Sequence, residues 1–302
     1  MKDDANILAA GTRVLLTGGS GFIGRHLLAR LAAAGAEIHC TTRGSAPADL
    51  PGVWHSLDLS DAPAAEALIV ELRPEVVFHL ASHVAGSRDV SLVWPTLRDN
   101  LASTVALMTA LVKAGGCRRF VQAGSLEEPD DPSAAPASPY AAAKAGASLY
   151  ARMFHQLYGL PVVTARIFMV YGPGRQDEKK LVPYTIRCLL RGEIPGFSSG
   201  VRPVDWVYVD DVAEGLLRLA AAEGVAGRLV DLGRGELHTV RQVVEEIFRQ
   251  LAPGTAPSFG DLGDRPAEQV RTARRAATLE ALGWAPATPL ADGLRRTIDS
   301  FR

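Results

Sequence analysis

The sequence is poor in cysteine. Only Cys40, Cys117 and Cys188 occur in 302 residues, and they lie far apart without the close spacing of a metal-binding motif. We therefore expect small buried thiols rather than metal ligands. No apolar run reaches the roughly 18 residues of a membrane-spanning helix, and residues 1–10 lack the basic end and apolar core of a secretory signal. These absences favour a cytoplasmic protein without a membrane partner.

An excess of charge is missing as well. Lysine and arginine number 32 against 33 aspartates and glutamates, which gives a formal net charge of −1. Such a balance gives no electrostatic reason to expect nucleic acid or an anionic membrane as a partner. Apolar residues make up 47% of the chain and charged residues 22%. This is ordinary globular composition, and the length suits one large domain or two modest ones.

Short apolar runs alternate with helical stretches over the first 170 residues. This alternation is typical of βαβ units, in which parallel strands are joined by right-handed crossovers. It predicts an α/β fold, a Rossmann doubly wound parallel sheet with a smaller, partly interleaved C-terminal lobe. The predicted strands are 13–17, 37–41, 53–58, 76–81, 119–123 and 161–168, and the predicted helices are 21–34, 62–72, 96–114 and 139–158.

The character of the chain changes after Tyr171. Loop-rich segments, 172–174 and 195–203, separate shorter helical stretches. We predict a dinucleotide-binding domain over 1–170 with about 205–225, and a substrate-binding lobe over 171–204 and 226–302. The helices predicted in this half are 182–191, 209–222, 240–251, 274–282 and 290–301.

A glycine-rich turn follows the first predicted strand, with the spacing G-x-x-G-x-x-G. Glycine allows a tight turn, lets backbone N–H groups approach a pyrophosphate and packs helix against strand. The helix that follows adds partial positive charge at its N-terminus. The position between a strand and a helix favours dinucleotide binding over a plain tight turn. The predicted cofactor contacts here are Gly18, Ser20, Gly21, Phe22, Ile23 and Gly24.

The end of the second predicted strand, Thr41-Thr42-Arg43, bears on the choice of cofactor. Rossmann proteins that bind NAD usually place an acidic side chain here, on the ribose hydroxyls. A carboxylate would repel a 2′-phosphate, whereas an arginine pairs with it. Thr42 and Arg43 therefore favour NADP. NAD remains the alternative, in which Arg43 is a solvated or adenine-stacking residue.

Tyr140 and Lys144 stand four residues apart at the start of a predicted helix. That spacing is about one helical turn, so the two side chains share a face. Free tyrosine titrates near pH ~10, too high for proton exchange at neutrality. A neighbouring ammonium favours the phenolate and lowers this value. The pair is common on helix surfaces, but its position after a dinucleotide fingerprint favours a catalytic acid/base.

A hydroxyl is expected near this pair, at the end of the preceding strand. Val121-Gln122-Ala123-Gly124 leads into Ser125, fifteen residues before the tyrosine. A serine at the end of a strand is often structural. Beside Tyr140 and Lys144, we interpret Ser125 as the group that orients the oxygen of a substrate carbonyl or hydroxyl.

The glycine turn, Ser125 and Tyr140-x-x-x-Lys144 together resemble the extended short-chain dehydrogenase/reductase family over nearly the whole chain. Segments 166–174 and 205–211 are similar to further motifs of that family. The resemblance implies a nucleoside-diphosphate sugar held between the two lobes. It also implies cofactor contacts from Asp58, Leu59, Leu80, Ala81, Ser82, Asn100, Tyr140 and Lys144.

Segment 124–128 bears on the reaction. It looks most like the matching stretch of GDP-4-keto-6-deoxymannose reductases, which reduce a C4 ketone with NADPH. Glu127 occupies the position where sugar 4,6-dehydratases carry their eliminating base, but the usual polar group just before it is Leu126. The resemblance therefore favours reduction of a 4-keto-6-deoxy sugar, with Ser125, Tyr140, Lys144 and Glu127 as catalytic residues. A 4-epimerase and a 4,6-dehydratase are the alternatives.

Several positions depart from the family pattern. The usual asparagine is Met169, the expected arginine before Asp205 is Val204, and Pro129-Asp130 replaces a tyrosine–glycine pair. These departures point to an unusual sugar or base. The predicted substrate contacts are His83, Met169, Arg175, Val182, Arg202 and Arg265.

A homodimer is also implied by the resemblance, through a four-helix bundle. The predicted helices 96–114 and 139–158 carry apolar residues for such a bundle, unless those faces pack on the chain's own sheet. A second class of function is a dinucleotide-binding sensor without chemistry, since fold does not fix function; the complete set of catalytic residues argues against it. The apolar residues considered for the dimer are Leu101, Leu107, Met108, Leu111, Ala145, Leu149 and Met153.

Overall fold

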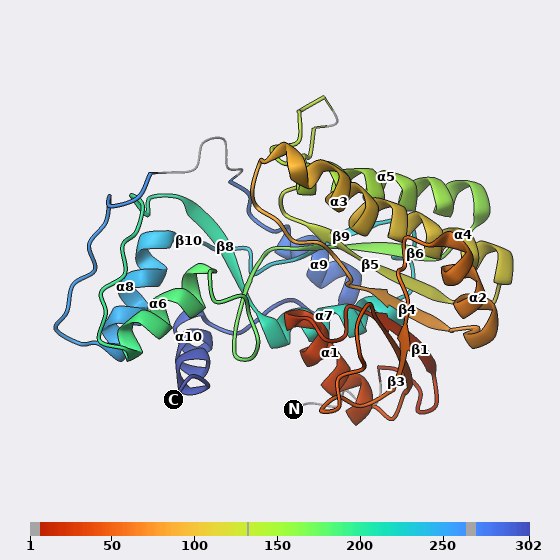
Figure 1. Cartoon of the computed structure of the whole chain (residues 1–302), viewed down its shortest axis with the longest axis horizontal. Coiled ribbons are helices and arrows are strands. Elements are labelled where there is room, and N and C mark those ends of the chain that lie inside the picture. The colour runs from red at the N-terminus through yellow and green to blue at the C-terminus, as the bar shows by residue number, and fades with distance from the viewer. Residues whose placement is uncertain (1–6, 132, 264–269) are drawn as a thin grey trace.

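The computed structural model describes residues 7–131, 133–263 and 270–302, and Figure 1 shows them as two unequal lobes. The larger lobe is built on a seven-stranded sheet with the order β3-β2-β1-β4-β5-β6-β9. All of its neighbouring strands run parallel. This confirms the predicted Rossmann-type α/β fold. The strands are β1 (Arg13–Thr17), β2 (Glu37–Thr42), β3 (Val53–Ser56), β4 (Val76–His79), β5 (Arg119–Ser125), β6 (Val162–Ile167) and β9 (Leu229–Leu232).

Helices cover both faces of this sheet. Side chains alternate along a strand, so Val14 and Leu16 pack on α1 (Phe22–Ala33) and α7 (Val209–Ala221). Leu15 between them faces the opposite core, under α2 (Ala62–Leu72), α4 (Ser103–Ala114) and α5 (Pro139–Tyr158). Every strand in the middle of the sheet is therefore buried on both sides, as its near-continuous apolar sequence predicts.

The predicted helix 96–114 is helical throughout, but its winding changes along its length. The chain enters it through a 3₁₀ turn (Val90–Leu92) and α3 (Val93–Thr96), then widens into a π-helical segment (Leu97–Ala102) before α4. Such segments are rare and occur often at functional sites. Asn100 lies inside it, fully buried.

Helix α5 begins with a local sequence signal. The Ser138 hydroxyl accepts the N–H of Ala141 and Pro139 fills the first position, while Gly159 ends the helix with φ 67°. These are standard start and stop signals. Across the described residues, no helix is both long and apolar enough to cross a bilayer.

The smaller lobe has a three-stranded sheet, β10 (Leu237–Thr239), β8 (Pro203–Tyr208) and β7 (Met169–Tyr171). Strands β7 and β8 are parallel, and β8 and β10 are antiparallel. Helices α6 (Leu181–Leu190), α8 (Val240–Leu251) and α10 (Leu290–Asp299) complete it. Its own core includes Tyr171, Trp206 and Ile247.

Two features of the second half differ from the sequence prediction. Strand β9 joins the large sheet beside β6, and α9 (Arg275–Leu282) packs on it, although both fall in the predicted substrate lobe. Residues 205–208 of β8 lie in the small sheet, although we expected them in the larger domain. Both strands are short and pair with strands distant in sequence, which local apolar patterns do not reveal.

Candidate active site

The glycine turn joins β1 to α1, and its glycines are required by close backbone contacts. Gly18 has φ 73°, and a Cβ there would come within 2.6 Å of the Ala81 nitrogen at the end of β4. A Cβ on Gly24 would overlap the Gly18 carbonyl oxygen, which also accepts the Gly21 N–H at 3.0 Å. Helix α1 has no side-chain cap and no acidic residue in its first turn. Its N-terminal N–H groups are thus arranged to meet a pyrophosphate.

A buried histidine fixes the adjoining strand ends. The Thr17 hydroxyl accepts the N–H of Ala81 and bonds Nδ1 of His79 at 2.7 Å. His79 Nε2 bonds the Thr104 hydroxyl at 2.9 Å, and that hydroxyl donates to the Asn100 carbonyl. Burial, together with the charge of Lys144, lowers the His79 pKa to about 3, so the ring is neutral. This network holds the segment 80–82 against the glycine turn.

Asn100 holds the loop after β4. Its Oδ1 accepts the Ser82 hydroxyl at 3.1 Å and the His83 N–H at 2.6 Å, and its Nδ2 donates to the His83 carbonyl at 3.1 Å. The predicted cofactor residues Leu80, Ala81, Ser82 and Asn100 are therefore gathered at one edge of the sheet. His83 lies in the same loop, with Nδ1 3.6 Å from the Asp99 carboxylate.

Tyr140 and Lys144 meet on the buried face of α5, as their spacing predicts. Lys144 Nζ donates to the Ala123 carbonyl of β5 at 2.9 Å and lies 5.9 Å from the centre of the Tyr140 ring. Burial lowers the Lys144 pKa to about 8, against the effect of the Glu128 carboxylate. Burial also raises the Tyr140 pKa, and hydrogen bonds with Ser125 and Ser82 oppose that rise. The ammonium therefore supplies a positive charge next to the phenol.

Ser125 ends β5 and faces Tyr140. Its hydroxyl acts to lower the pKa of Tyr140 and accepts the Glu127 N–H at 3.2 Å. The Glu127 carboxylate is half-buried and accepts the Ser138 hydroxyl at 3.4 Å, beside the start of α5. Leu126 instead packs into the core of the larger lobe. The four predicted catalytic residues are thus brought together.

The sequence interpretation missed a set of charged residues under the loop that follows β5 (residues 126–130). Arg166 is buried in a bidentate pair with Asp231 and also pairs with Asp130. Arg271 contacts Asp130 at 3.0 Å and donates to the Leu126 carbonyl at 2.7 Å. These pairs tie the loop after β5 to β6 and to the segment before α9. Their partners lie 36 to 145 residues apart, so sequence spacing gave no signal.

Arg43 lies at the end of β2, exposed over 62% of its side chain. Its guanidinium bonds the Asp99 carboxylate at 2.9 Å, and Arg98 bonds the same group at 2.7 Å. The Thr42 hydroxyl accepts the Gly44 N–H. Among the other predicted adenine-end contacts, Asp58 is exposed and accepts two hydrogen bonds from Ser60, and Leu59 is buried.

The predicted substrate residues are more dispersed. Met169 is partly buried on β7, opposite Trp206 of β8. Arg175 is exposed, and its charge acts on the Asp49 carboxylate of the larger lobe. Arg202 is partly buried, and its carbonyl accepts the Val240 N–H. Val182 is 2% exposed inside the core of the small lobe, so its side chain supports that lobe and does not offer a ligand contact. Arg265 lies outside the described residues.

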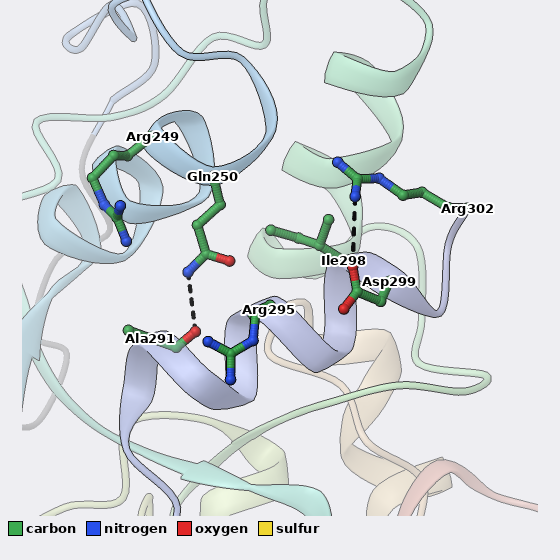
Figure 2. Close-up of a pocket in the computed structure, with 7 residues that line it drawn as sticks. All are labelled: Arg249, Gln250, Ala291, Arg295, Ile298, Asp299 and Arg302. Atoms are coloured by element: carbon green, nitrogen blue, oxygen red, sulfur yellow. Dashed lines mark hydrogen bonds and ion pairs between the residues drawn. The ribbon is translucent and has the colours of Figure 1, made fainter.

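A cavity of about 450 Å³ between α8 and α10 lies within the small lobe (Figure 2). Three arginines line it, Arg249, Arg295 and Arg302, but they pair with Glu246, Asp292 and Asp299. The charges therefore balance, and the cavity has no excess charge to attract an anion. A second cavity of about 480 Å³ lies beside the start of α5, next to Ser138, and is lined mainly by apolar residues.

Similarity to known proteins extends over nearly the whole chain. The family description "NAD dependent epimerase/dehydratase family" matches residues 14–233. A UDP-glucose 4-epimerase of Mycolicibacterium smegmatis is 30% identical over 96% of this chain and 98% of its own. A dTDP-glucose 4,6-dehydratase of Neisseria gonorrhoeae is 29% identical over 95% of both chains. The crystal structure of the Thermus thermophilus UDP-glucose 4-epimerase with NAD superposes with a TM-score of 0.80 at 31% identity, over 96% of this chain and 98% of that one.

Proposed function

Because this chain belongs to the NAD dependent epimerase/dehydratase family of nucleotide-sugar enzymes, we propose that it oxidises the C4 hydroxyl of a nucleoside-diphosphate sugar as the first step of its reaction. The observation that carries this proposal is the meeting of Ser125, Tyr140 and Lys144 at the strand ends that also bear the glycine turn. The names of the relatives support a nucleotide sugar as the substrate class.

In this step the chain's own residues move one proton and hold one oxygen. When bound, the oxidised dinucleotide accepts the hydride from sugar C4. Tyr140 takes the hydroxyl proton as the C4–O bond becomes a carbonyl, so proton and hydride leave from the two ends of one C–O–H unit. Lys144 remains protonated near neutrality and stabilises the phenolate. Ser125 hydrogen-bonds the reacting oxygen and fixes its direction.

After oxidation at C4, epimerisation is the reaction that needs the fewest additional catalytic groups. The 4-keto sugar would rotate and present its other face to the returning hydride, and Tyr140 would give its proton back to the C4 oxygen, so that both the hydride and the proton return to the sugar. The relatives support this outcome and dehydration better than the reductase interpretation that the sequence first favoured.

Dehydration across C5 and C6 is the second candidate, and Glu127 favours it. Elimination needs a base for the C5 proton and an acid for the C6 hydroxyl. The half-buried Glu127 carboxylate beside Tyr140 suits the first role. Leu126 is packed in the core and supplies no second acid, so Glu127 would have to return the same proton to the leaving hydroxyl, which departs as water. The 4-keto-6-deoxy product would then require the hydride taken from C4 to be returned to C6 and a proton from solvent to be added at C5.

Product analysis by NMR separates these reactions. We expect UDP-glucose or dTDP-glucose, incubated without added reductant, to give the C4 epimer for an epimerase and a 4-keto-6-deoxy sugar for a dehydratase. A reductase would instead consume a reduced cofactor mole for mole with a 4-keto substrate. Failure of a panel of nucleotide sugars to react with either redox state of the cofactor would contradict the proposal.

Glu127→Gln is expected to distinguish the two completions. Loss of the carboxylate removes the C5 base, so elimination should fall by about 10²-fold or more. Epimerisation should change less than about tenfold, because Tyr140 and the hydride suffice for it. Glu178→Gln, which changes an exposed carboxylate paired with Arg187, is the matched control. An unchanged rate of elimination in the Glu127 variant would remove this residue from the mechanism.

We further propose NADP as the preferred cofactor. Arg43 stands at the end of β2 without a carboxylate on the same strand end, and its exposed guanidinium is anchored on Asp99. A 2′-phosphate would find a cation there. NAD is the alternative, supported by the family description and by the complex with NAD cited above.

We also propose a homodimer formed through α3 and α5. Leu107, Met108 and Leu111 are buried in the chain's own core, which corrects their assignment to an interface. Trp94 on α3 and Leu149 on α5 are instead 68% and 58% exposed. Large exposed apolar side chains on adjacent helices mark interaction surfaces. Sedimentation equilibrium should give a dimer at micromolar concentration and a monomer for Leu149→Lys; a monomeric wild type would refute this.

A further inference from the structure

We propose that Glu128 is a positioning residue of the active site, which fixes the backbone of Ser125 and places a buried negative charge behind Lys144. The inference rests on the proposed function, because it concerns the same acid/base pair. Nothing in the local sequence distinguishes Glu128 from Glu127, and only their directions in the fold separate them.

The Glu128 side chain folds back onto the end of β5. Its Oε1 accepts the backbone N–H of Ser125 at 2.6 Å, and its Oε2 accepts the Ser148 hydroxyl of α5 at 2.6 Å. A Cβ on Gly124 would lie only 2.7 Å from Oε1, so glycine at that position makes room for the carboxylate. One buried carboxylate, 4% exposed, thus joins the catalytic strand to the catalytic helix.

This geometry acts directly on Ser125. A hydrogen bond to its N–H fixes the peptide plane from which the serine side chain projects toward Tyr140. The serine hydroxyl must hold a reacting oxygen within hydrogen-bond reach, where errors of about 1 Å are costly. Glu127, by contrast, accepts the Ser138 hydroxyl and has no hydrogen bond to the Ser125 backbone N–H among the described residues.

Charged and titratable groups from several elements face Glu128. They are Lys144 and Tyr140 from α5, Arg166 from β6, and Arg271 from the segment before α9, with Glu127 on the same loop. Burial raises the Glu128 pKa, and the hydrogen bonds from Ser148 and Ser125 and the charges of Lys144 and Arg166 oppose that rise. In turn, the Glu128 carboxylate raises the pKa of both Lys144 and Tyr140.

The charge of Glu128 should affect how the rate of oxidation depends on pH. The competent pair is phenolate Tyr140 with protonated Lys144, so the rate should follow a bell-shaped profile whose two limbs report the macroscopic pKa values of the coupled pair. Removing a nearby negative charge favours deprotonation of both groups. Both limbs of the profile should then move in the same direction, toward lower pH. A residue with a purely structural role would lower the height of the profile without moving it.

Glu128→Gln is the suitable variant, because it removes the charge and keeps the shape. The amide oxygen can accept the Ser125 N–H, and the amide NH₂ can donate to the Ser148 hydroxyl. We expect both limbs of the kcat/KM profile to shift down by about half a pH unit to one unit. Ser148→Ala removes one hydrogen bond to Glu128 and keeps the carboxylate, and should move both limbs less than Glu128→Gln does.

A second readout needs no substrate. The ¹³Cε NMR signal of Lys144, identified by its absence in Lys144→Arg, should titrate at about pH 8 in the wild type. It should titrate at lower pH in Glu128→Gln and at the wild-type pH in Glu127→Gln, because Glu127 is not among the groups that shift Lys144.

The outcomes separate this proposal from the proposed function. Shifts of the NMR titration and of both limbs support the role of Glu128. If the wild type turns over no nucleotide sugar but the Lys144 titration moves, the proposed function fails and the placement of the charge stands. Limbs or a Lys144 signal that stay at the wild-type pH in Glu128→Gln overturn the inference.

Discussion

Tyr140→Phe is expected to reduce turnover by about 10²–10⁴-fold, the range attributed to a positioned acid/base group. The phenylalanine keeps the ring that is buried on α5 and loses only the hydroxyl that meets Ser125 and Ser82. Cofactor affinity should remain within a few-fold, because the glycine turn and α1 are untouched. Steady-state kinetics and binding of the dinucleotide, measured by the change in tryptophan fluorescence, test both parts.

Tyr150→Phe is the matched control for this change. Tyr150 lies on the same helix but is 41% exposed, so its variant should keep wild-type kinetics. Near-normal activity of Tyr140→Phe would refute the assignment of the acid/base. Cofactor binding by a wild type that never turns over a sugar nucleotide would instead favour a dinucleotide sensor.

The second large effect is expected from Arg43→Asp. This change removes a cation at the end of β2 and adds an anion beside Asp99. A hydrogen bond to a charged group contributes about 1.5–3 kcal/mol, so the ratio of the dissociation constants for NADP and NAD should change by about 10- to 100-fold in favour of NAD. Isothermal titration calorimetry with each dinucleotide measures this ratio.

Arg118→Asp provides the control. Arg118 is half-exposed just before β5, at the opposite edge of the sheet from the glycine turn, where its nearest carboxylate is Glu75 at 3.8 Å. Its replacement makes the same change in net charge without altering the cofactor end. An unchanged ratio in Arg43→Asp would show that this arginine is a surface residue, and NADP would lose its support.

Elements whose signals are local in sequence were predicted well. Helix α5 has the same bounds in the structure as in the prediction, because Ser138, Pro139 and Gly159 mark its ends. The face shared by Tyr140 and Lys144 follows from one helical turn. Strand β1 and the glycine turn also needed no distant information. The spacing of three glycines is enough to identify a turn whose close backbone contacts leave no room for a Cβ.

Elements that depend on distant partners were missed or misplaced. Strand β9 was assigned to the wrong lobe because the residues of β6 with which it pairs lie 65 residues earlier. The helix expected over 96–114 forms without a gap, but residues 97–102 wind as a π-helical segment, in which Asn100 reaches back to the loop after β4. Neither feature changes the local apolar pattern from which helices and strands are predicted.

The substrate side shows the same contrast. Val182 falls on an apolar helix face, which fits a core position or a ligand wall equally well, and the structure places it in the core. Arg175 was predicted to contact the substrate, and its charge acts on Asp49 of the larger lobe. The arrangement of two lobes decides such contacts.

The sequence by itself determined the Rossmann sheet, the dinucleotide turn and the Tyr140–Lys144 pair, because each depends on spacing within one strand, turn or helix. Only the tertiary structure decided which of two adjacent glutamates faces the tyrosine and which is buried behind Ser125. It also decided that Arg166 and Arg271 hold the loop that follows β5. The direction of a side chain after a strand end is set by the partners it finds, and here those partners come from α5, β6 and the segment before α9.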